Sequence, residues 1–244
     1  MKLSAILFDL DGTLLPMDND LFTKVYFSHL AKAAAAWGYT DSEFLIKAVW
    51  KGVAAMVQND NRRSNADAFW QAFQALTQRD VSQDLARFSR FYDTDFNKAR
   101  EAAAPTPLAK EALLLARKKA RHVILATNPI FPRNADETRL SWLGLSCDDF
   151  DLVTDYENCG YCKPNPDYYR DILARFGLEP EKCLMIGNDV DEDVLPAQEL
   201  GIKAFLLDDY VINRHGRLYD CPRGSYAQMI QYLQNLDETP SPDR

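Results

Sequence analysis

Two acidic residues stand close to the N-terminus, where an apolar run ends in Asp9-Leu10-Asp11-Gly12-Thr13. The run Ile6-Leu7-Phe8 before them is typical of a buried strand of a parallel sheet, so the acids are expected at its C-terminal end. Two residues apart on extended chain, Asp9 and Asp11 point to the same side. Such a pair can bind a divalent cation or divide the roles of nucleophile and acid. The alternative is an ordinary Asp-Gly turn after a strand, and residues further along the chain decide between the two interpretations.

Polar residues also follow three later apolar runs: Thr127 and Asn128, then Lys163, and then Asn188, Asp189, Asp191 and Asp193. Because parallel strands end at a common edge of their sheet, residues this far apart in sequence can meet in one crevice. Carboxylates attract Mg²⁺, which prefers oxygen ligands. The hydroxyl of Thr127, nearby backbone N–H groups and the charge of Lys163 could hold a phosphoryl group beside that cation.

Alternating strands and helices are expected to position these residues. Apolar runs at 122–128, 151–155, 182–187 and 203–207 predict strands after the first one, and amphipathic segments between them predict helices. The helix at 166–176 has the clearest signals, with Asn165 as cap, Pro166 in the first turn and Gly177 at the end. The sequence therefore predicts an α/β fold with a doubly wound, mostly parallel sheet. A last helix is expected at 225–236, followed by a frayed tail at 237–244.

Residues 17–104 interrupt this alternation with helical periodicity alone. We predict a helical cap domain at 17–104, inserted into a core domain formed by 1–16 and 105–244. Asp20 is expected to cap its first helix, and Thr40 to Glu43 form a capping box for the second. A single last helix is expected to run through Phe96. The aromatic residues of the insert recur at helical spacing, which favours a packed bundle core over a ligand cage.

Composition narrows the possible partners and compartment. The 244 residues carry a formal charge of -8, so no basic surplus favours nucleic acid or an acidic membrane surface. No apolar run reaches transmembrane length. The five cysteines are irregularly spaced, which is typical of a reducing compartment, and we predict a cytoplasmic protein. Cys159 and Cys162 have CxxC spacing, but a zinc site would need a second ligand pair.

Taken together, these residues resemble the four motifs of the haloacid dehalogenase-like hydrolase superfamily. Asp9 to Thr13 is similar to its DxDGT opening, Thr127 to its second motif, Lys163 to its third, and Gly187 to Asp193 to its acidic fourth. The helical insert between the first two motifs resembles the branch with a mobile α-helical cap. This resemblance implies a Rossmann-like core.

The resemblance also implies roles for the four motifs. Asp9 would attack the substrate phosphorus and form an aspartyl-phosphate, while Asp11 would protonate the leaving oxygen and then activate water. Thr127, Asn128 and Lys163 would bind and stabilise the phosphoryl group.

A Mg²⁺ ion would be held by the Asp9 carboxylate, the Asp11 backbone carbonyl and Asp189, with Asp193 as supporting partner of the metal site. The fourth motif departs from the usual Gly-Asp, because Asn188 follows Gly187. Alignment on Gly187 would put Asn188 at the metal. The four-residue spacing from Asp189 to Asp193 instead favours Asp189.

We predict a Mg²⁺-dependent phosphatase that acts on a small phosphorylated metabolite. Members of the family that act as dehalogenases lack an acid at the position of Asp11, so this residue indicates phosphoester chemistry. Two alternatives remain open: a phosphomutase of the same superfamily, and a non-catalytic protein that keeps the fold to bind a phosphorylated ligand or a regulatory partner.

Overall fold

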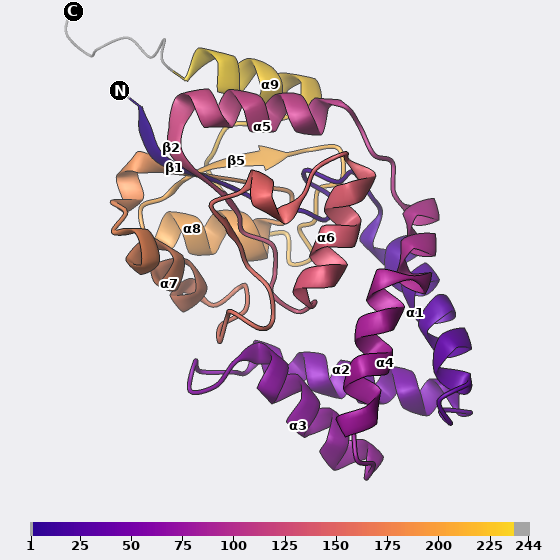
Figure 1. Ribbon diagram of the computed structural model, residues 1–244. Coiled ribbons are helices and arrows are strands. Elements are labelled where there is room, and N and C mark those ends of the chain that lie inside the picture. Colours follow the sequence, from indigo (N-terminus) through magenta and orange to yellow (C-terminus); the bar gives the residue numbers. More distant parts are fainter. Residues whose placement is uncertain (1, 237–244) are drawn as a thin grey trace, which may run out of the picture.

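A computed structural model of the protein describes residues 2–236, and Figure 1 shows a twisted parallel sheet covered by helices on both faces. In the described chain the sheet has six strands in the order β3-β2-β1-β4-β5-β6, and every neighbouring pair is parallel. The strands are β1 (Leu3–Phe8), β2 (Ala120–Leu125), β3 (Leu152–Val153), β4 (Cys183–Gly187), β5 (Lys203–Leu207) and β6 (Arg223–Gly224). The predicted α/β class and five of these strands are confirmed, whereas β6 was not predicted from the sequence. The tail predicted to fray lies outside the described residues.

Strand β1 lies in the middle of the sheet, between β2 and β4. Ile6 pairs with Val123 on one side and with Leu184 on the other. The last four residues of β1 and all of β4 are buried, because helices cover both faces of the sheet. The C-terminal ends of β1, β2 and β4 therefore lie side by side at the centre of one edge of the sheet. The candidate site lies at this edge.

The helices of the core divide between the two faces of the sheet, and alternate residues of β1 separate them. Ile6 and Phe8 pack in a cluster with α5 (Leu108–Lys119), α6 (Arg133–Trp142) and α9 (Tyr226–Asn235). Ala5 and Leu7 pack with α7 (Pro166–Phe176) and α8 (Leu195–Glu199) on the opposite face. This division confirms the doubly wound arrangement, since a strand presents successive side chains to opposite faces.

Local signals account for the ends of several helices. The Asn165 side chain accepts a hydrogen bond from Asp167 N at 3.0 Å, and Gly177 ends α7 in the left-handed region at φ 60°. Ser225 begins α9 with a capping box, as the predicted helix requires. The remaining short turns of the core are η2 (Cys147–Asp149), η3 (Pro180–Lys182) and the π-helical turn η4 (Val190–Val194), which leads into α8.

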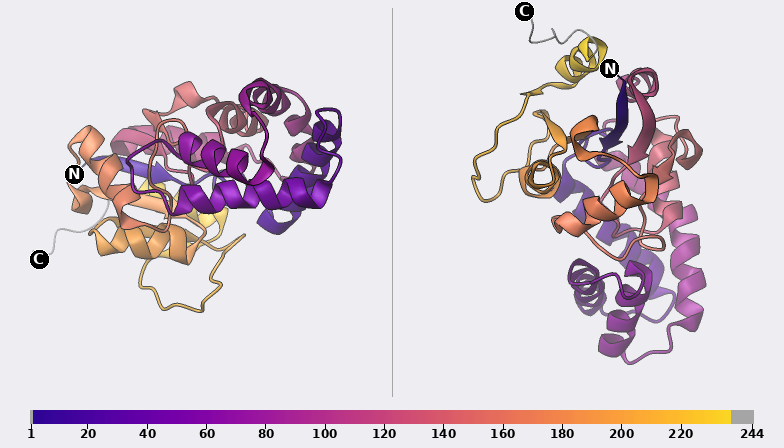
Figure 2. Two further views of the ribbon diagram at one scale, coloured as in Figure 1. Left: turned by 90° about the horizontal axis from the view of Figure 1, so that it is seen from below. Right: turned by 90° about the vertical axis from the view of Figure 1, so that its left-hand side faces the viewer.

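A second group of helices, here called the cap, lies beside the sheet at one end (Figure 2). It contains α1 (Asn19–Ala35), α2 (Ser42–Val57), α3 (Asn65–Thr77), α4 (Ser82–Asp93) and the 3₁₀ helix η1 (Asp95–Ala102). The chain enters and leaves the cap side by side, because Met17 and Ala103 form an antiparallel bridge and Ala104 N donates to Pro16 O at 2.8 Å.

Three predictions about the ends of these helices were wrong. Asp18 caps α1, and Asp41 caps α2, in place of Asp20 and Thr40. In each case the side chain reaches the N–H three residues further on, which only the last non-helical residue can do. The single helix predicted through Phe96 breaks at Thr94, where φ is -127° and ψ is -86°, and continues as η1.

Buried hydrogen bonds fasten the cap to loops of the core. Asn65 Nδ2 donates to Pro129 O at 3.2 Å, and the N–H of Ala66 donates to Tyr156 O at 2.7 Å. On the other side of the cap, Thr138 Oγ1 on α6 donates to Tyr92 O at 3.1 Å. The cap therefore contacts the core both next to the Lys163 loop and along α6. None of the described helices is long and apolar enough to cross a membrane.

Candidate active site

A cavity of about 310 Å³ lies between the edge of the sheet and the cap. Its core side is lined by residues that follow β1, β2 and β4, namely Asp9, Asp11, Thr127, Asn128, Asn188, Asp189, Glu192 and Asp193. The structure thus brings together every residue singled out at the ends of these strands except Asp191. Lys163 does not line the cavity, but its ammonium group contacts two carboxylates that do.

Lys163 is buried and points inward from the loop before α7. Its Nζ donates to Asp9 Oδ1 at 2.9 Å and to Asp193 Oδ1 at 2.6 Å. Burial works against the ammonium charge, but the carboxylates of Asp193 and Asp9 outweigh it and hold the pKa of Lys163 well above its usual range. A charged ammonium group therefore stands between the first and fourth motifs, where it orients the Asp9 carboxylate.

Asp193 supports the loop after β4. Its Oδ2 accepts hydrogen bonds from the N–H groups of Asn188 at 3.1 Å and Asp189 at 3.0 Å, while Oδ1 accepts from Lys163. Burial raises the pKa of Asp193 to about 8, although the Lys163 ammonium opposes this shift. A Cβ at Gly187 would lie 2.2 Å from Oδ2, so only glycine admits the carboxylate this close to the strand. Both oxygens of Asp193 are thus engaged in holding its neighbours.

The side chains of Asn188 and Asp189 have different surroundings. Asn188 Oδ1 accepts a hydrogen bond from Thr13 Oγ1 at 3.0 Å, and its Nδ2 donates to Tyr210 O at 2.7 Å. Asp189 Oδ1 accepts from the N–H groups of the next turn, but within residues 2–236 its Oδ2 takes part in no hydrogen bond. Burial raises the pKa of Asp189. Of the two, Asp189 has the oxygen available to a cation.

Sequence reasoning missed a buried arginine beside Asp11. Arg139 on α6 is fully buried and donates to Asp11 Oδ2 and Asp136 Oδ1, and its guanidinium carbon lies 4.5 Å from the centre of the Phe131 ring. Burial raises the pKa of Asp11, with the Arg139 charge opposing it, and Asp11 Oδ1 is buried without a hydrogen-bond partner among residues 2–236. Asp136 and Arg139 have the spacing of an ordinary surface pair on a helix, so the sequence does not reveal that this face is buried.

A second contact missed from the sequence joins Asn128 to Glu192. Asn128 Nδ2 donates to Glu192 Oε2 at 3.0 Å, and Asn128 Oδ1 is buried without a partner in the part of the chain that the structure describes. Burial raises the pKa of Glu192 to about 7. Thr127 is buried beside them, and its carbonyl oxygen accepts from Tyr168 Oη at 3.0 Å. Glu192 thus lines the cavity beside Asn128.

The core side of the cavity suits a hard cation. Five carboxylates line it, and one buried ammonium group faces two of them, so negative charge is in excess. Unpartnered oxygens of Asp11 and Asp189 add acceptors to this excess. Among residues 2–236 no three His, Cys, Asp or Glu side chains are grouped to hold a metal. A Mg²⁺ site needs fewer, because this ion keeps several water ligands and uses one or two carboxylates.

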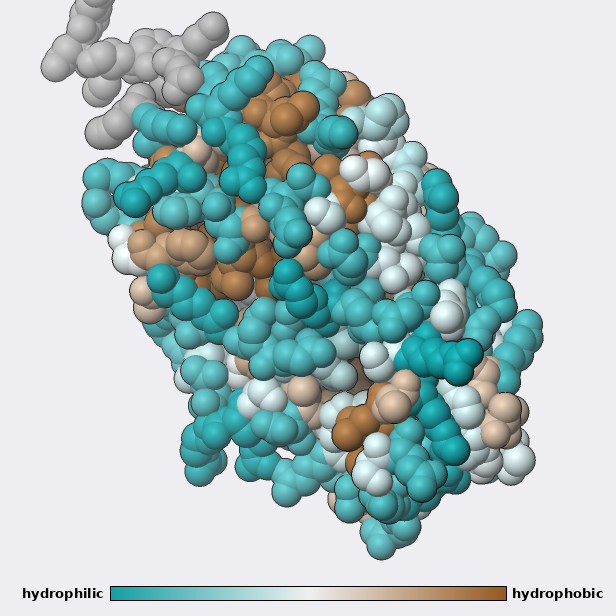
Figure 3. Space-filling model, viewed as in Figure 1, coloured by the Kyte–Doolittle hydropathy of each residue, from teal (hydrophilic) through white to brown (hydrophobic). Residues whose placement is uncertain are grey.

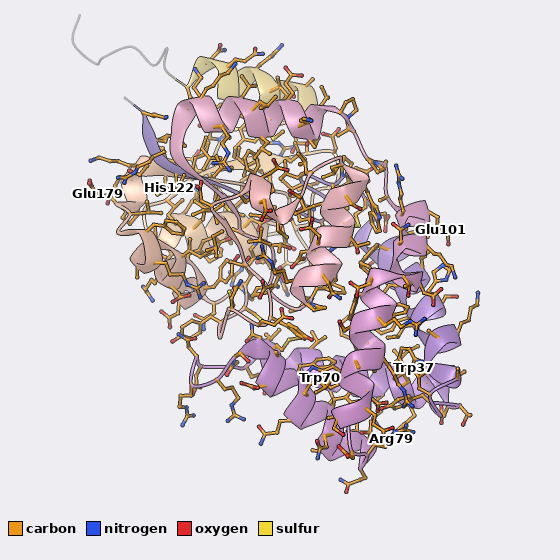
Figure 4. The ribbon with its side chains drawn as sticks, in the orientation of Figure 1. Trp37, Trp70, Arg79, Glu101, His122 and Glu179 are labelled. Atoms are coloured by element: carbon orange, nitrogen blue, oxygen red, sulfur yellow. The ribbon has the colours of Figure 1, made fainter. Side chains whose placement is uncertain are left out.

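Aromatic residues of the cap form the opposite wall of the cavity. Those on the lining are Phe22, Tyr26, Phe27, Trp50, Phe69, Trp70, Phe88 and Tyr92. The interpretation as a packed bundle core is confirmed by contacts between helices, such as Trp70 of α3 with Phe88 of α4, whose ring centres are 5.2 Å apart. The same rings also line the cavity, which sequence periodicity does not predict. Figure 4 shows Trp70 in the cap, below the sheet and its helices.

Comparison with known proteins identifies similar sequences and structures. The family model described as haloacid dehalogenase-like hydrolase matches residues 3–201. A glyceraldehyde 3-phosphate phosphatase of Methanocaldococcus jannaschii is 40% identical over 89 residues, which cover 36% of this chain and 39% of that protein. Across the first four curated relatives the match spans between 26% and 44% of the relative's length.

Two solved structures share the fold over nearly the whole chain. A HAD phosphatase from Thermococcus onnurineus has a TM-score of 0.58 and 20% identity, with 95% of this chain and 98% of that chain covered. A 2-haloacid dehalogenase from Pseudomonas syringae has a TM-score of 0.61 and 18% identity, with coverages of 96% and 99%. At these identities the likeness establishes the fold alone.

Proposed function

Because the chain belongs to the haloacid dehalogenase-like hydrolase family, we propose that it is a Mg²⁺-dependent phosphatase that hydrolyses a small phosphorylated metabolite through a phosphoryl group carried by Asp9. The observation that carries this proposal is the position of Lys163, whose buried ammonium group contacts both Asp9 and Asp193 at the end of the cavity. Phosphatases among the curated relatives also support it. The presence of Asp11 favours phosphoester chemistry over dehalogenation.

Asp9 and Asp11 divide the proposed reaction between them. An Asp9 carboxylate oxygen attacks phosphorus in line, and the bond from phosphorus to the ester oxygen breaks as Asp11 gives that oxygen a proton. In the second step, Asp11 takes a proton from a water molecule that attacks phosphorus. The bond between phosphorus and Asp9 then breaks, which releases phosphate and restores both carboxyl groups.

The residues around Asp9 stabilise the charge of the phosphoryl group. The Lys163 ammonium is proposed to neutralise part of this charge, and the hydroxyl of Thr127 and the N–H groups near Asn128 are proposed to bind phosphoryl oxygens. Buried, pre-oriented donors are effective because they need no reorganisation during the reaction.

We propose that Mg²⁺ is held by the Asp9 carboxylate, the Asp11 backbone carbonyl and Asp189, with Asp193 as the residue that holds their loop in place. The engaged amide of Asn188 and the unpartnered oxygen of Asp189 support Asp189 over Asn188 as the ligand. When bound, the ion would neutralise charge on the phosphoryl oxygens.

The cap, proposed as a domain at 17–104 inserted into a core of 1–16 and 105–244, covers this site. Its entry and exit segments pair at Met17 and Ala103, which supports these boundaries. A cover of this kind excludes bulk water from the phosphoryl group and supplies contacts to the rest of the substrate.

The test is release of p-nitrophenol from p-nitrophenyl phosphate with Mg²⁺. We expect turnover that EDTA abolishes and that Asp9→Asn reduces by at least about 10³-fold, because the nucleophile is lost. Asp20→Asn makes the same change on the exposed first turn of α1 and should leave the rate unchanged. Turnover that persists in Asp9→Asn or in EDTA would falsify the mechanism.

The proton donor has a separate test. Asp11→Asn should reduce hydrolysis of an alkyl phosphate far more than hydrolysis of p-nitrophenyl phosphate, because p-nitrophenolate leaves without a proton. Equal losses on both esters would remove Asp11 from the role of acid. A phosphomutase would instead return a phosphorylated isomer without release of phosphate.

A further inference from the structure

The cavity continues from the acidic edge of the sheet into the cap. One end has Asp9 and Asp11, and the other is lined by Phe22, Val49, Val53 and other apolar side chains. A phosphate ester whose phosphoryl group lies at Asp9 therefore extends its leaving group into the cap. The volume of about 310 Å³ is at the lower end of the range for small-molecule sites, about 300 to 1,000 Å³.

The cap wall of this cavity carries no charge. None of the cap residues that line it is Asp, Glu, Lys, Arg or His. Among the described residues, the one on the lining with a positive charge is Arg214, which is exposed on a loop of the core. A carboxylate or a second phosphate on the leaving group would thus lose its water without gaining a cationic partner in the cap, which is costly.

The hydroxyl groups on this wall are partly engaged, since in the pair of Tyr26 and Tyr92 one O–H donates and the other stays free to donate. Tyr26 and Tyr92 are hydrogen-bonded to each other at 3.0 Å, and Thr23 Oγ1 donates to Asn19 O at 2.7 Å. The side-chain oxygen of Asn19, Oδ1, also lies on this wall, and it is a buried acceptor without a partner in the described chain. A polyol would therefore bury several hydroxyls and find one free acceptor, Asn19 Oδ1, and one free donor, from the tyrosine pair.

Resting on the proposed phosphatase function, we propose that the site selects phosphate monoesters whose leaving group is apolar, either aromatic or aliphatic, with at most one hydrogen-bond donor, which Asn19 Oδ1 accepts. The acidic edge of the sheet binds the phosphoryl group, and the cap binds the carbon skeleton. Sugar phosphates, phosphorylated amino acids and bisphosphates are poor substrates, because they bury more polar groups than the cap wall has partners for.

A homologous series of n-alkyl phosphates tests this selection, since their leaving groups have similar acidity. We expect kcat/KM to rise about fourfold for each methylene from ethyl to pentyl phosphate, as burial of a methylene contributes about 0.8 kcal/mol. Glycerol phosphate should be slower than n-propyl phosphate, and 4-carboxyphenyl phosphate slower than phenyl phosphate. A flat or falling series, or preference for the polar member of each pair, overturns the proposal.

Binding separates this proposal from the proposed function. Dissociation constants of n-alkylphosphonates, measured by calorimetry with Mg²⁺, should fall along the same series whether or not the protein hydrolyses esters. Binding that tightens with chain length without any ester hydrolysis would overturn the phosphatase function and keep the apolar site. Hydrolysis of esters without any dependence of binding on chain length would overturn the apolar site and keep the phosphatase function.

Two substitutions in α2 locate the selectivity at the cap. Val53→Thr places a hydroxyl on the lining with little change of shape and should lower kcat/KM for pentyl phosphate about fivefold. Val25→Thr makes the same change off the lining and should have no effect. Val53→Lys should reverse the preference between phenyl and 4-carboxyphenyl phosphate, and Phe44→Lys, outside the cavity on the same helix, should not. Unchanged selectivity in both Val53 variants overturns the assignment to this wall.

Discussion

The two sides of the cavity are built in opposite ways. The core side brings together charged groups from distant parts of the chain, and the ammonium group of Lys163 contacts the carboxylates of both Asp9 and Asp193. The cap side consists of aromatic and aliphatic side chains from neighbouring helices, and none of its lining residues is charged. On the face shown in Figure 3, hydrophobic residues gather mainly over the sheet and its helices, with a smaller group in the cap.

This difference separates the proposed chemistry from the proposed selection. Oriented charges act on a reacting phosphoryl group, so a change among them should alter rate and stability together. An apolar wall contributes in proportion to the area it buries, so a change there should alter preference among substrates by smaller factors. The predictions below test this separation, from the largest expected effect to the smallest.

Lys163→Met should have the largest effect. Loss of the ammonium group leaves Asp9 and Asp193 close together and unpaired, so we expect kcat/KM for p-nitrophenyl phosphate to fall about 10³-fold and unfolding to become easier by about 3 to 5 kcal/mol. Urea denaturation measures the second quantity. Lys182→Met removes an exposed partner of Glu179 and should change stability by less than about 1 kcal/mol. A Lys163→Met protein of normal rate would contradict the role of the ammonium group.

Arg139→Met should destabilise the fold by about 3 kcal/mol, because Asp11 and Asp136 lose their shared partner. Adding Asp136→Leu should recover much of the stability. The rate of ester hydrolysis should stay about tenfold below that of the native protein, because Asp11 still lacks the contact with Arg139 that orients it. Arg170→Met provides the matched control, as Arg170 forms an exposed pair with Asp167 at the same spacing. Full recovery of the rate in the double variant would show that Arg139 serves stability alone.

Asn65→Leu should weaken the attachment of the cap. The variant loses the hydrogen bond to Pro129 O and leaves Asn59 without its Asn65 acceptor, so we expect a loss of about 2 kcal/mol in the free energy of unfolding. Thermal denaturation followed by tryptophan fluorescence measures it. Asn134→Ala removes an exposed bond between core and cap and should cost less than about 1 kcal/mol. Equal losses in the two variants would contradict the importance of the buried contact.

Glu192→Gln should change the pH dependence of stability. Burial raises the pKa of Glu192 to about 7, whereas a Glu carboxyl of the unfolded chain titrates near 4.3. Between these values the folded protein binds more protons, so its stability falls as pH rises, and the fall is complete above the folded value. In EDTA and between pH 5 and pH 8, we expect the free energy of unfolding to fall by about 2 kcal/mol less in the variant than in the native protein. Parallel profiles of the free energy of unfolding against pH, for the variant and the native protein, would show that Glu192 does not cause the pH dependence.

The sequence alone predicted the class of fold and most of its elements. The uninterrupted apolar runs that became β1, β2 and β4 predicted a buried parallel sheet, because only strands covered on both faces tolerate such runs. The two-residue strand β6 was missed, since so short a segment has no periodicity to detect. The caps of α1 and α2 lie one or two residues from their predicted positions, because two neighbouring residues of capping type were available, Asp18 and Asp20 for α1 and Thr40 and Asp41 for α2.

The part of the candidate site that follows the strand ends was predicted from the sequence. Asp9, Thr127 and Asp189 follow three adjacent strands, and a shared edge brings such residues together whatever their separation in sequence. Pairings across the site could not be predicted in this way. That Arg139 contacts Asp11, and that Glu192 contacts Asn128, depends on which face of a helix or turn is buried.

The sequence by itself determined the chemical groups available and the edge at which they gather, because local pattern reveals the residue types and the strand ends, and parallel strands end at a common edge. Tertiary structure alone decided how these groups are paired and what faces them. Packing between distant segments buried Arg139 and Lys163 and joined aromatic rings of separate helices into one wall, since burial depends on contacts between segments far apart in the chain.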